Sequence, residues 1–177
     1  MAKQASSSMT RLQRRWSEKL TNEKFQRRST AIHEAAHAVV AHVMGERVEL
    51  LTISQRITDT LGCKVRHGNC RIGYTVRRGK SDPISMAVVS LAGHEAEVIM
   101  CGRPIQFLPA GDYKDLLKLG CSERNANVVG WMARKFIRAN AKAIRRVAWL
   151  LNERGVMTRK QFLKAFEFGS RGETTEP

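Results

Sequence analysis

Two histidines stand four residues apart in an apolar stretch, residues 29–44. Ser29 or Thr30 can cap the first turn of a helix there, and the glycine that follows the stretch is a typical helix end. Residues i and i+4 lie on one face of a helix, so His33 and His37 would direct two imidazoles at one point. The stretch is apolar on most sides, which predicts a buried, central helix.

The sequence of this stretch also indicates a chemistry. Residues 33–37 read His-Glu-Ala-Ala-His. Zinc accepts imidazole nitrogen in tetrahedral geometry. Glu34 follows the first histidine, where it can act as general base toward water and then pass the proton to a leaving amine. The alternative is a core helix with hydrogen-bonded histidines. We favour a zinc metallopeptidase that hydrolyses peptide bonds, with His33 and His37 as metal ligands and Glu34 as the catalytic base.

A catalytic zinc needs a third protein ligand and one open position. The metzincin continuation of the motif is absent, because Val40 and Val43 stand where it needs glycine and histidine. The other candidates are carboxylates that lie downstream in the chain: Glu95, Glu97, Asp112 and Asp115. The two aspartates follow a loop rich in proline and glycine, at the start of a predicted helix.

The remaining pattern predicts a mainly helical domain with a small sheet. A second helix should begin at Asp82 with Pro83 in its first turn and end at Gly102. Its small residues Ser90 and Gly93 share a face with Glu97, so another helix can approach closely there. The other expected strands and helices are Val48–Ser54, Cys63–Val65, Arg71–Val76, Asp112–Cys121, Asn125–Arg154 as one helix or two, and a short helix from Thr158 through Phe166. The expected fold is a zincin-like helical metallopeptidase domain with a β-hairpin or three-stranded sheet beside the zinc helix.

These motifs together resemble the peptidase domain of FtsH-type, membrane-anchored AAA proteases. That family has His-Glu-Ala-Gly-His on a helix, a strand pair with Leu-Gly in its turn, a second helix rich in Ala and Glu, and a later aspartate. The matching pieces here are His33–His37, Leu51–Ile53, Leu61-Gly62, Leu91–Gly93, Ala96–Ile99, Gly102 and Ala110–Asp112. The similarity covers roughly residues 28–136 and extends more loosely to Phe166.

The resemblance implies that the third zinc ligand is an aspartate at a helix start, which fits Asp112 better than Asp115. It leaves Asp115 and Glu97 to accept an imidazole N–H behind the ligands. Ala36 stands where the family has glycine, a small change. The ATPase module and the transmembrane anchor of the family are missing from the sequence. We therefore expect a free-standing peptidase module that acts on peptides or unfolded protein segments, and whose unfolding power, if any, comes from a separate ATPase.

The charge balance points to a second function class. Lys and Arg number 31 against 16 Asp and Glu, a formal charge of +15. Such a surface attracts nucleic acid, anionic membrane or acidic protein segments. The alternative function is thus a basic nucleic-acid-binding or regulatory module with a structural or vestigial zinc site. A peptidase that cleaves one transcriptional regulator is a further option. The basic residues of the long helical segment are Arg134, Lys135, Arg138, Lys142, Arg145 and Arg146.

The two ends of the chain and its cysteines allow expectations about domain bounds, location and thiol state. Residues 1–28 form a basic arm, residues 29–168 the peptidase domain, and residues 169–177 a polar, disordered tail. No apolar run resembles a signal sequence or approaches the length of a membrane span. A cytoplasmic location with free thiols is the default. Cys63, His67 and Cys70 could also approach a metal, but they match no common zinc spacing.

Overall fold

The computed structural model describes residues 11–54, 69–73, 82–102 and 123–171. The described chain is mostly helical with one small sheet, which confirms the predicted fold class. Its elements in order are α1 (Arg11–Val43), β1 (Arg47–Thr52), β2 (Asn69–Gly73), α3 (Pro83–Cys101), α5 (Glu123–Ala139), α6 (Ala141–Arg154), β3 (Val156–Thr158) and α7 (Arg159–Ser170).

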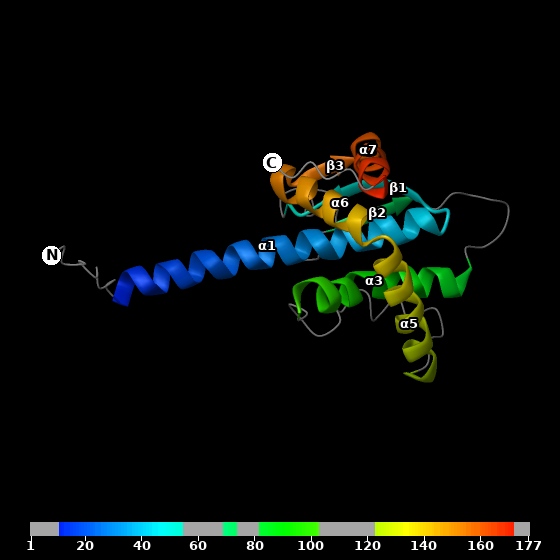
Figure 1. Ribbon diagram of the computed structural model, residues 1–177, viewed down its shortest axis with the longest axis horizontal. Coiled ribbons are helices and arrows are strands. Elements are labelled where there is room, and N and C mark those ends of the chain that lie inside the picture. Colours follow the sequence, from blue (N-terminus) through cyan, green and yellow to red (C-terminus); the bar gives the residue numbers. More distant parts are fainter. Residues whose placement is uncertain (1–10, 55–68, 74–81, 103–122, 172–177) are drawn as a thin grey trace.

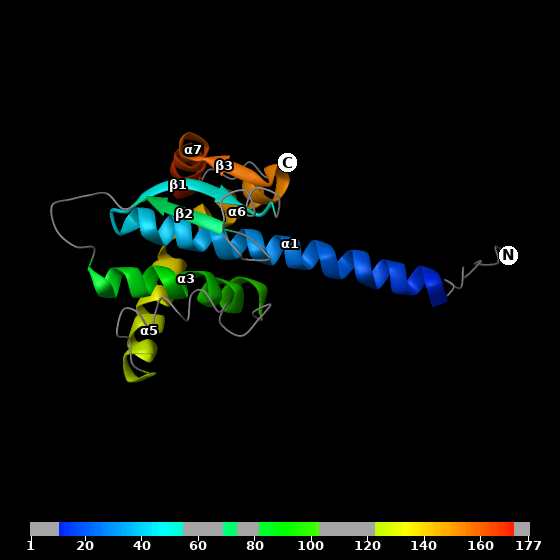
Figure 2. The ribbon, with the colours of Figure 1, turned by 180° about the vertical axis from the view of Figure 1, so that it is seen from behind.

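Helix α1 is the axis of the fold. The sheet, α6 and α7 lie on one side of it, and α3 and α5 lie on the other (Figures 1 and 2). The N-terminal part of α1 projects beyond the other elements in both views. The histidine motif falls in the part of α1 that is enclosed by its neighbours, because residues 31–41 are all buried.

The helix start expected at Ser29 or Thr30 is wrong, because α1 runs without a break from Arg11. Ser29 is fully buried within the helix. Thr30 Oγ1 donates to the carbonyl of Gln26 at 2.9 Å, as a mid-helix threonine does. No proline or glycine precedes Ser29 in the helix, and the Gln and Arg residues around it favour helix continuation. The division into an arm and a domain at residue 28 stays a prediction.

The sheet has three strands in the order β2-β1-β3, and both pairs are antiparallel. Leu51 of β1 is fully buried and pairs with Cys70 on one side and Met157 on the other. Strand β2 lies slightly earlier than the predicted strand at 71–76, and the predicted strand at 63–65 lies outside the described residues. Strand β3 was not predicted, because three residues are too short to show an alternating pattern.

The ends of the other helices follow local signals. The Asp82 carboxylate accepts the backbone N–H of Ile84 at 3.3 Å and of Ser85 at 3.1 Å, and Gly102 ends α3 in the left-handed conformation, as predicted. Asn140 separates α5 from α6. Helix α7 continues to Ser170, so the tail predicted from residue 169 begins too early. Gly169 lies within the helix without the positive φ of a helix-ending glycine, and a Cβ at this position would come within 2.7 Å of the Ala143 Cα. This glycine lets α7 pack closely on α6.

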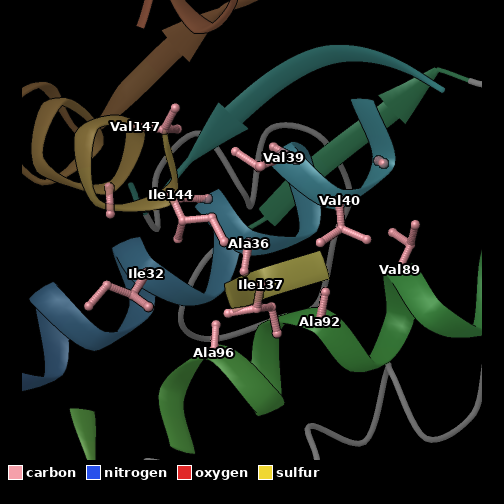
Figure 3. Close-up of a cluster of buried hydrophobic side chains, with 14 of the residues drawn as sticks. Ile32, Ala36, Val39, Val40, Val89, Ala92, Ala96, Ile137, Ile144 and Val147 are labelled. Carbon is pink, nitrogen blue, oxygen red and sulfur yellow. The ribbon is translucent and has the colours of Figure 1, made fainter. Parts of the chain in front are cut away.

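Small side chains fill the contact between α1 and α3. Ala36 and Val40 of α1 face Val89, Ala92 and Ala96 of α3, and all five are buried (Figure 3). Alanine on both helices allows the helix axes to approach closely. Beyond this contact the core continues through buried residues of α5 and α6, including Ile137, Ile144 and Val147 (Figure 3). The close approach brings the polar residues of α3 to the histidines of α1.

Among the described residues, α3 is the one helix long and apolar enough to cross a membrane, with a mean hydropathy of 1.4 over its best window. Half of that window is buried inside the structure. A core helix meets the same criterion, so length and composition alone do not identify α3 as a membrane span.

Candidate metal centre

The two histidines of α1 meet as the sequence predicted. His33 Nε2 and His37 Nε2 lie 2.9 Å apart. The rings stand edge to face, with centroids 4.6 Å apart and planes at 80°. Only 8% of His33 and 7% of His37 is exposed. Both imidazoles therefore present the same ring nitrogen to one buried point.

The opposite nitrogen of each ring faces an oxygen of α3. His37 Nδ1 lies 2.7 Å from the carbonyl oxygen of Val89. A carbonyl oxygen only accepts, so this contact places the proton of His37 on Nδ1. His33 Nδ1 lies 3.1 Å from Glu97 Oε1. The carboxylate favours a proton on that nitrogen as well.

With both protons on Nδ1, two lone pairs face each other across 2.9 Å. Two acceptors at this distance repel unless a proton or a cation lies between them. Two imidazole nitrogens bound to one tetrahedral zinc lie about 3.3 Å apart, given Zn–N distances of about 2.0–2.1 Å. Neutral imidazoles are also ligands that suit zinc. The donor set therefore fits a zinc ion, and the two nitrogens lie about 0.4 Å closer together than in an ideal tetrahedral site.

Because Gly93 of α3 has no side chain, there is space next to the Nε2 atoms of His33 and His37. A Cβ at this position would lie 2.5 Å from His37 Nε2 and 2.6 Å from His33 Nε2. Both distances are far inside van der Waals contact. The predicted face of Ser90, Gly93 and Glu97 is thus confirmed where it can be checked, since Gly93 and Glu97 both meet the histidines.

The predicted catalytic carboxylate lies beside the first histidine, and the predicted third ligand lies outside the described residues. Glu34 is 6% exposed and directly follows His33 on α1. Asp112 and Asp115 lie outside the described residues, as do Cys63 and His67. Within the described part of the chain, no group of three ligating side chains converges on one point. The roles given to Glu34, Asp112 and Asp115 stay predictions.

Glu95 is engaged elsewhere, so it does not serve the metal centre. Arg134 Nε donates to Glu95 Oε2 at 2.7 Å, and Arg134 Nη2 donates to Glu95 Oε1 at 3.1 Å. The hydrogen bond and charge of Glu95 raise the pKa of Arg134. This pair joins α3 to α5. Sequence spacing could not separate Glu95 from Glu97, because the packing of α5 decides which carboxylate faces which helix.

One feature of the metal centre and one feature of the neighbouring Glu95–Arg134 pair had no signal in the sequence. The Val89 carbonyl belongs to the backbone, and any residue at position 89 would offer one. Gly130 of α5 lies under the Glu95–Arg134 pair, where a Cβ would come within 3.0 Å of Glu95 Oε1. A glycine in a helix marks a close approach but does not identify the partner.

Comparison with known proteins shows the family to which the chain belongs. No match was found among curated proteins. A family model described as Peptidase M50B-like matches residues 15–116. This range covers more than half of the chain and includes both histidines, Glu34, Glu97 and the segment of Asp112. The chain belongs to the Peptidase M50B-like family, a family of zinc metallopeptidases.

Proposed function

We propose that this protein is a zinc endopeptidase in which His33, His37 and Asp112 hold the metal and Glu34 is the catalytic base. The observation that carries the proposal is the pair of Nε2 atoms 2.9 Å apart, each in a ring whose other nitrogen faces an oxygen acceptor. Such a pair of lone pairs suits a divalent cation, and the family match supports peptidase chemistry.

Each group at the site would have its own chemical role. Zinc, when bound, would polarise the scissile carbonyl and the attacking water. Glu34 would take the proton of that water and deliver it to the leaving amine. Glu97 and the Val89 carbonyl would hold the two rings in the tautomer that leaves Nε2 available to the metal. Burial of the motif would keep bulk water away from the reacting atoms.

The third ligand rests on the resemblance to the FtsH-type peptidase domain. In that family an aspartate at a helix start completes the zinc site, and the corresponding residue here is Asp112. Asp115 lies three residues further on in the sequence and would accept an imidazole N–H or face solvent. The range matched by the family model contains both aspartates, so it is compatible with either.

The substrate class follows from the site and the charge. A centre of this type acts on an extended segment of peptide or unfolded protein. The formal charge of +15 favours acidic segments. We further propose a cytoplasmic location and a separate ATPase partner that would supply unfolded chains.

The test is a cleavage assay with the zinc-loaded chain and fluorescein-labelled casein, an unfolded and acidic protein. Glu34→Gln keeps the size and polarity of the side chain but cannot accept the proton. Turnover should fall by at least about a hundredfold, while zinc content and thermal stability stay unchanged. Glu153→Gln, at an exposed site on α6, is the matched control and should cleave like the wild type. Cleavage retained by Glu34→Gln, or absent from the zinc-loaded wild type, would contradict the proposal.

A further inference from the structure

The outer face of α5 and α6 carries two tryptophans and four cations at helical spacing. The spacings between successive members alternate between four and three, so the members share one face of each helix. The core residues of both helices lie on the opposite face, among them Ala133 and Val147. We call this the tryptophan–cation face, and its residues are Trp131, Lys135, Arg138, Lys142, Arg145 and Trp149, all exposed.

The two indoles are held outward rather than buried. Trp131 is 55% exposed and Trp149 is 42% exposed. Lys135 Nζ lies 4.2 Å from the centroid of the Trp131 ring. Arg146 Cζ lies 4.8 Å from the Trp149 ring and 4.8 Å from that of Phe168, so it joins α6 to α7. Each indole thus has a cation over one ring face, an arrangement that is worth little in water and does not by itself explain the exposure.

The charge of this face has one sign. Residues 125–152 contain no acidic residue. Arg134 is engaged by Glu95, and it is therefore not counted as part of the face. The remaining cations follow one another along both helices between the two tryptophans. An anionic partner that also offers flat, stackable rings would complement both features.

We propose that the tryptophan–cation face binds single-stranded nucleic acid. Lys and Arg would contact successive phosphates, and unpaired bases would stack on the two indoles. An anionic membrane fits less well. A helix that lies in a membrane surface inserts a broad apolar strip, whereas the apolar strip of α5, Val129, Ala133 and Ile137, is buried in the core. On the described outer side of α5 only Val128 adds a large aliphatic side chain to Trp131.

This inference does not depend on the proposed peptidase chemistry, because the face shares no residue with the metal centre. The probes are fluorescein-labelled oligouridylate and oligothymidylate, and the readout is fluorescence anisotropy with the full zinc-loaded chain over a range of salt concentrations. Trp131→Ala and Trp149→Ala should each weaken binding by about fivefold or more, the scale of one lost base stack. Trp131→Phe keeps a ring and should restore most of the affinity. Far-UV circular dichroism of each variant checks that the helices are intact.

The cations are tested through the salt dependence. Arg138→Gln with Lys142→Gln removes two phosphate contacts and should reduce the slope of log Kd against log salt by about 1.4. Lys160→Gln with Lys164→Gln removes the same charge from exposed sites on α7 and should leave the slope unchanged. Glu34→Gln should bind like the wild type, which separates this inference from the peptidase proposal.

Several outcomes would overturn the inference. They are absence of oligonucleotide binding at low salt, equal losses in the α5–α6 and α7 double variants, or full affinity in both tryptophan-to-alanine variants. Tight binding to phosphatidylserine vesicles without oligonucleotide binding would assign the face to a membrane instead. Equal affinity for a duplex of the same length would mean that attraction to phosphates alone explains the binding. It would reject the stacking role of the indoles.

Discussion

Gly93→Ala should remove zinc from the protein while leaving its fold in place. The new Cβ would lie 2.5 Å from His37 Nε2 and 2.6 Å from His33 Nε2, whereas ordinary contact begins at 3.4 Å. The rings would have to retreat by about 0.9 Å, yet a metal site tolerates errors of only about 0.2 Å in its ligand distances. The retreat is also opposed by the Val89 carbonyl and Glu97 on the far side of the rings.

The expected losses of zinc affinity and of stability follow from the typical effects of comparable substitutions. Changing a single residue that supports one metal ligand costs about 10–100-fold in affinity, and here both ligands move, so we expect at least about a hundredfold loss. Overpacking costs about 1–3 kcal/mol, which is partly offset by the gain of about 1 kcal/mol for alanine over glycine in a helix. The free energy of unfolding of the metal-free protein should therefore fall by no more than about 2 kcal/mol.

The assay is competition for zinc against a chromogenic chelator, with thermal unfolding measured on the same samples. Gly169→Ala is the matched control, because its Cβ would meet the Ala143 Cα at 2.7 Å, in the contact between α6 and α7. It should lower stability without changing zinc affinity. Unchanged zinc affinity in Gly93→Ala, or an equal loss in Gly169→Ala, would refute the reasoning.

Other predictions concern the ligands and the pH dependence of stability. Asp112→Asn should abolish zinc binding and cleavage, Asp115→Asn should cost much less, and Glu97→Gln should weaken zinc by about 10–100-fold; isothermal titration gives the order, and a larger loss at Asp115 or Glu97 would reject Asp112 as the ligand. Burial and the charge of Arg159 lower the pKa of His42, against a smaller opposing effect of Glu167. The folded state thus binds the His42 proton less readily than the unfolded state, so this contribution to stability is complete above about pH 6.5 and is lost as the pH falls below it. His42→Gln should show a shallower fall in melting temperature between about pH 7.5 and 5, and an unchanged profile would contradict this.

The parts of the fold that depend on local chemistry could be predicted from the sequence. Asp82 followed by proline starts α3, and Gly102 and Gly155 end their helices, because capping needs only neighbouring atoms. Ser29 shows the limit of such signals. The same hydroxyl that can cap a helix can also lie within one, and the chain around it decides the outcome. The short strand β3 depends on its pairing with β1, which no local pattern reveals.

In the metal centre too, some features could be predicted from local sequence and others depend on contacts between helices. The spacing of His33 and His37 lies within one helix and was sufficient to bring their nitrogens together. The position of Glu97 beside the histidines could be predicted from its spacing from Gly93, because residues at this spacing lie on the same face of one helix. The tautomer of His37 depends on a backbone carbonyl from another helix, and the engagement of Glu95 depends on the packing of α5. Contacts between helices of this kind become visible only in the folded chain.

The central claim is that the two histidines of α1 hold the metal. X-ray absorption at the zinc edge of the zinc-loaded chain tests it most directly, because imidazole, carboxylate and thiolate ligands differ in distance and scattering. The account predicts two imidazoles and otherwise oxygen ligands at about 2.0–2.2 Å. His33→Ala and His37→Ala should each either remove one imidazole from the zinc shell or lose the zinc. Sulfur at about 2.3 Å, as Cys63 and Cys70 would supply, or a zinc shell unchanged by both histidine substitutions, would contradict it.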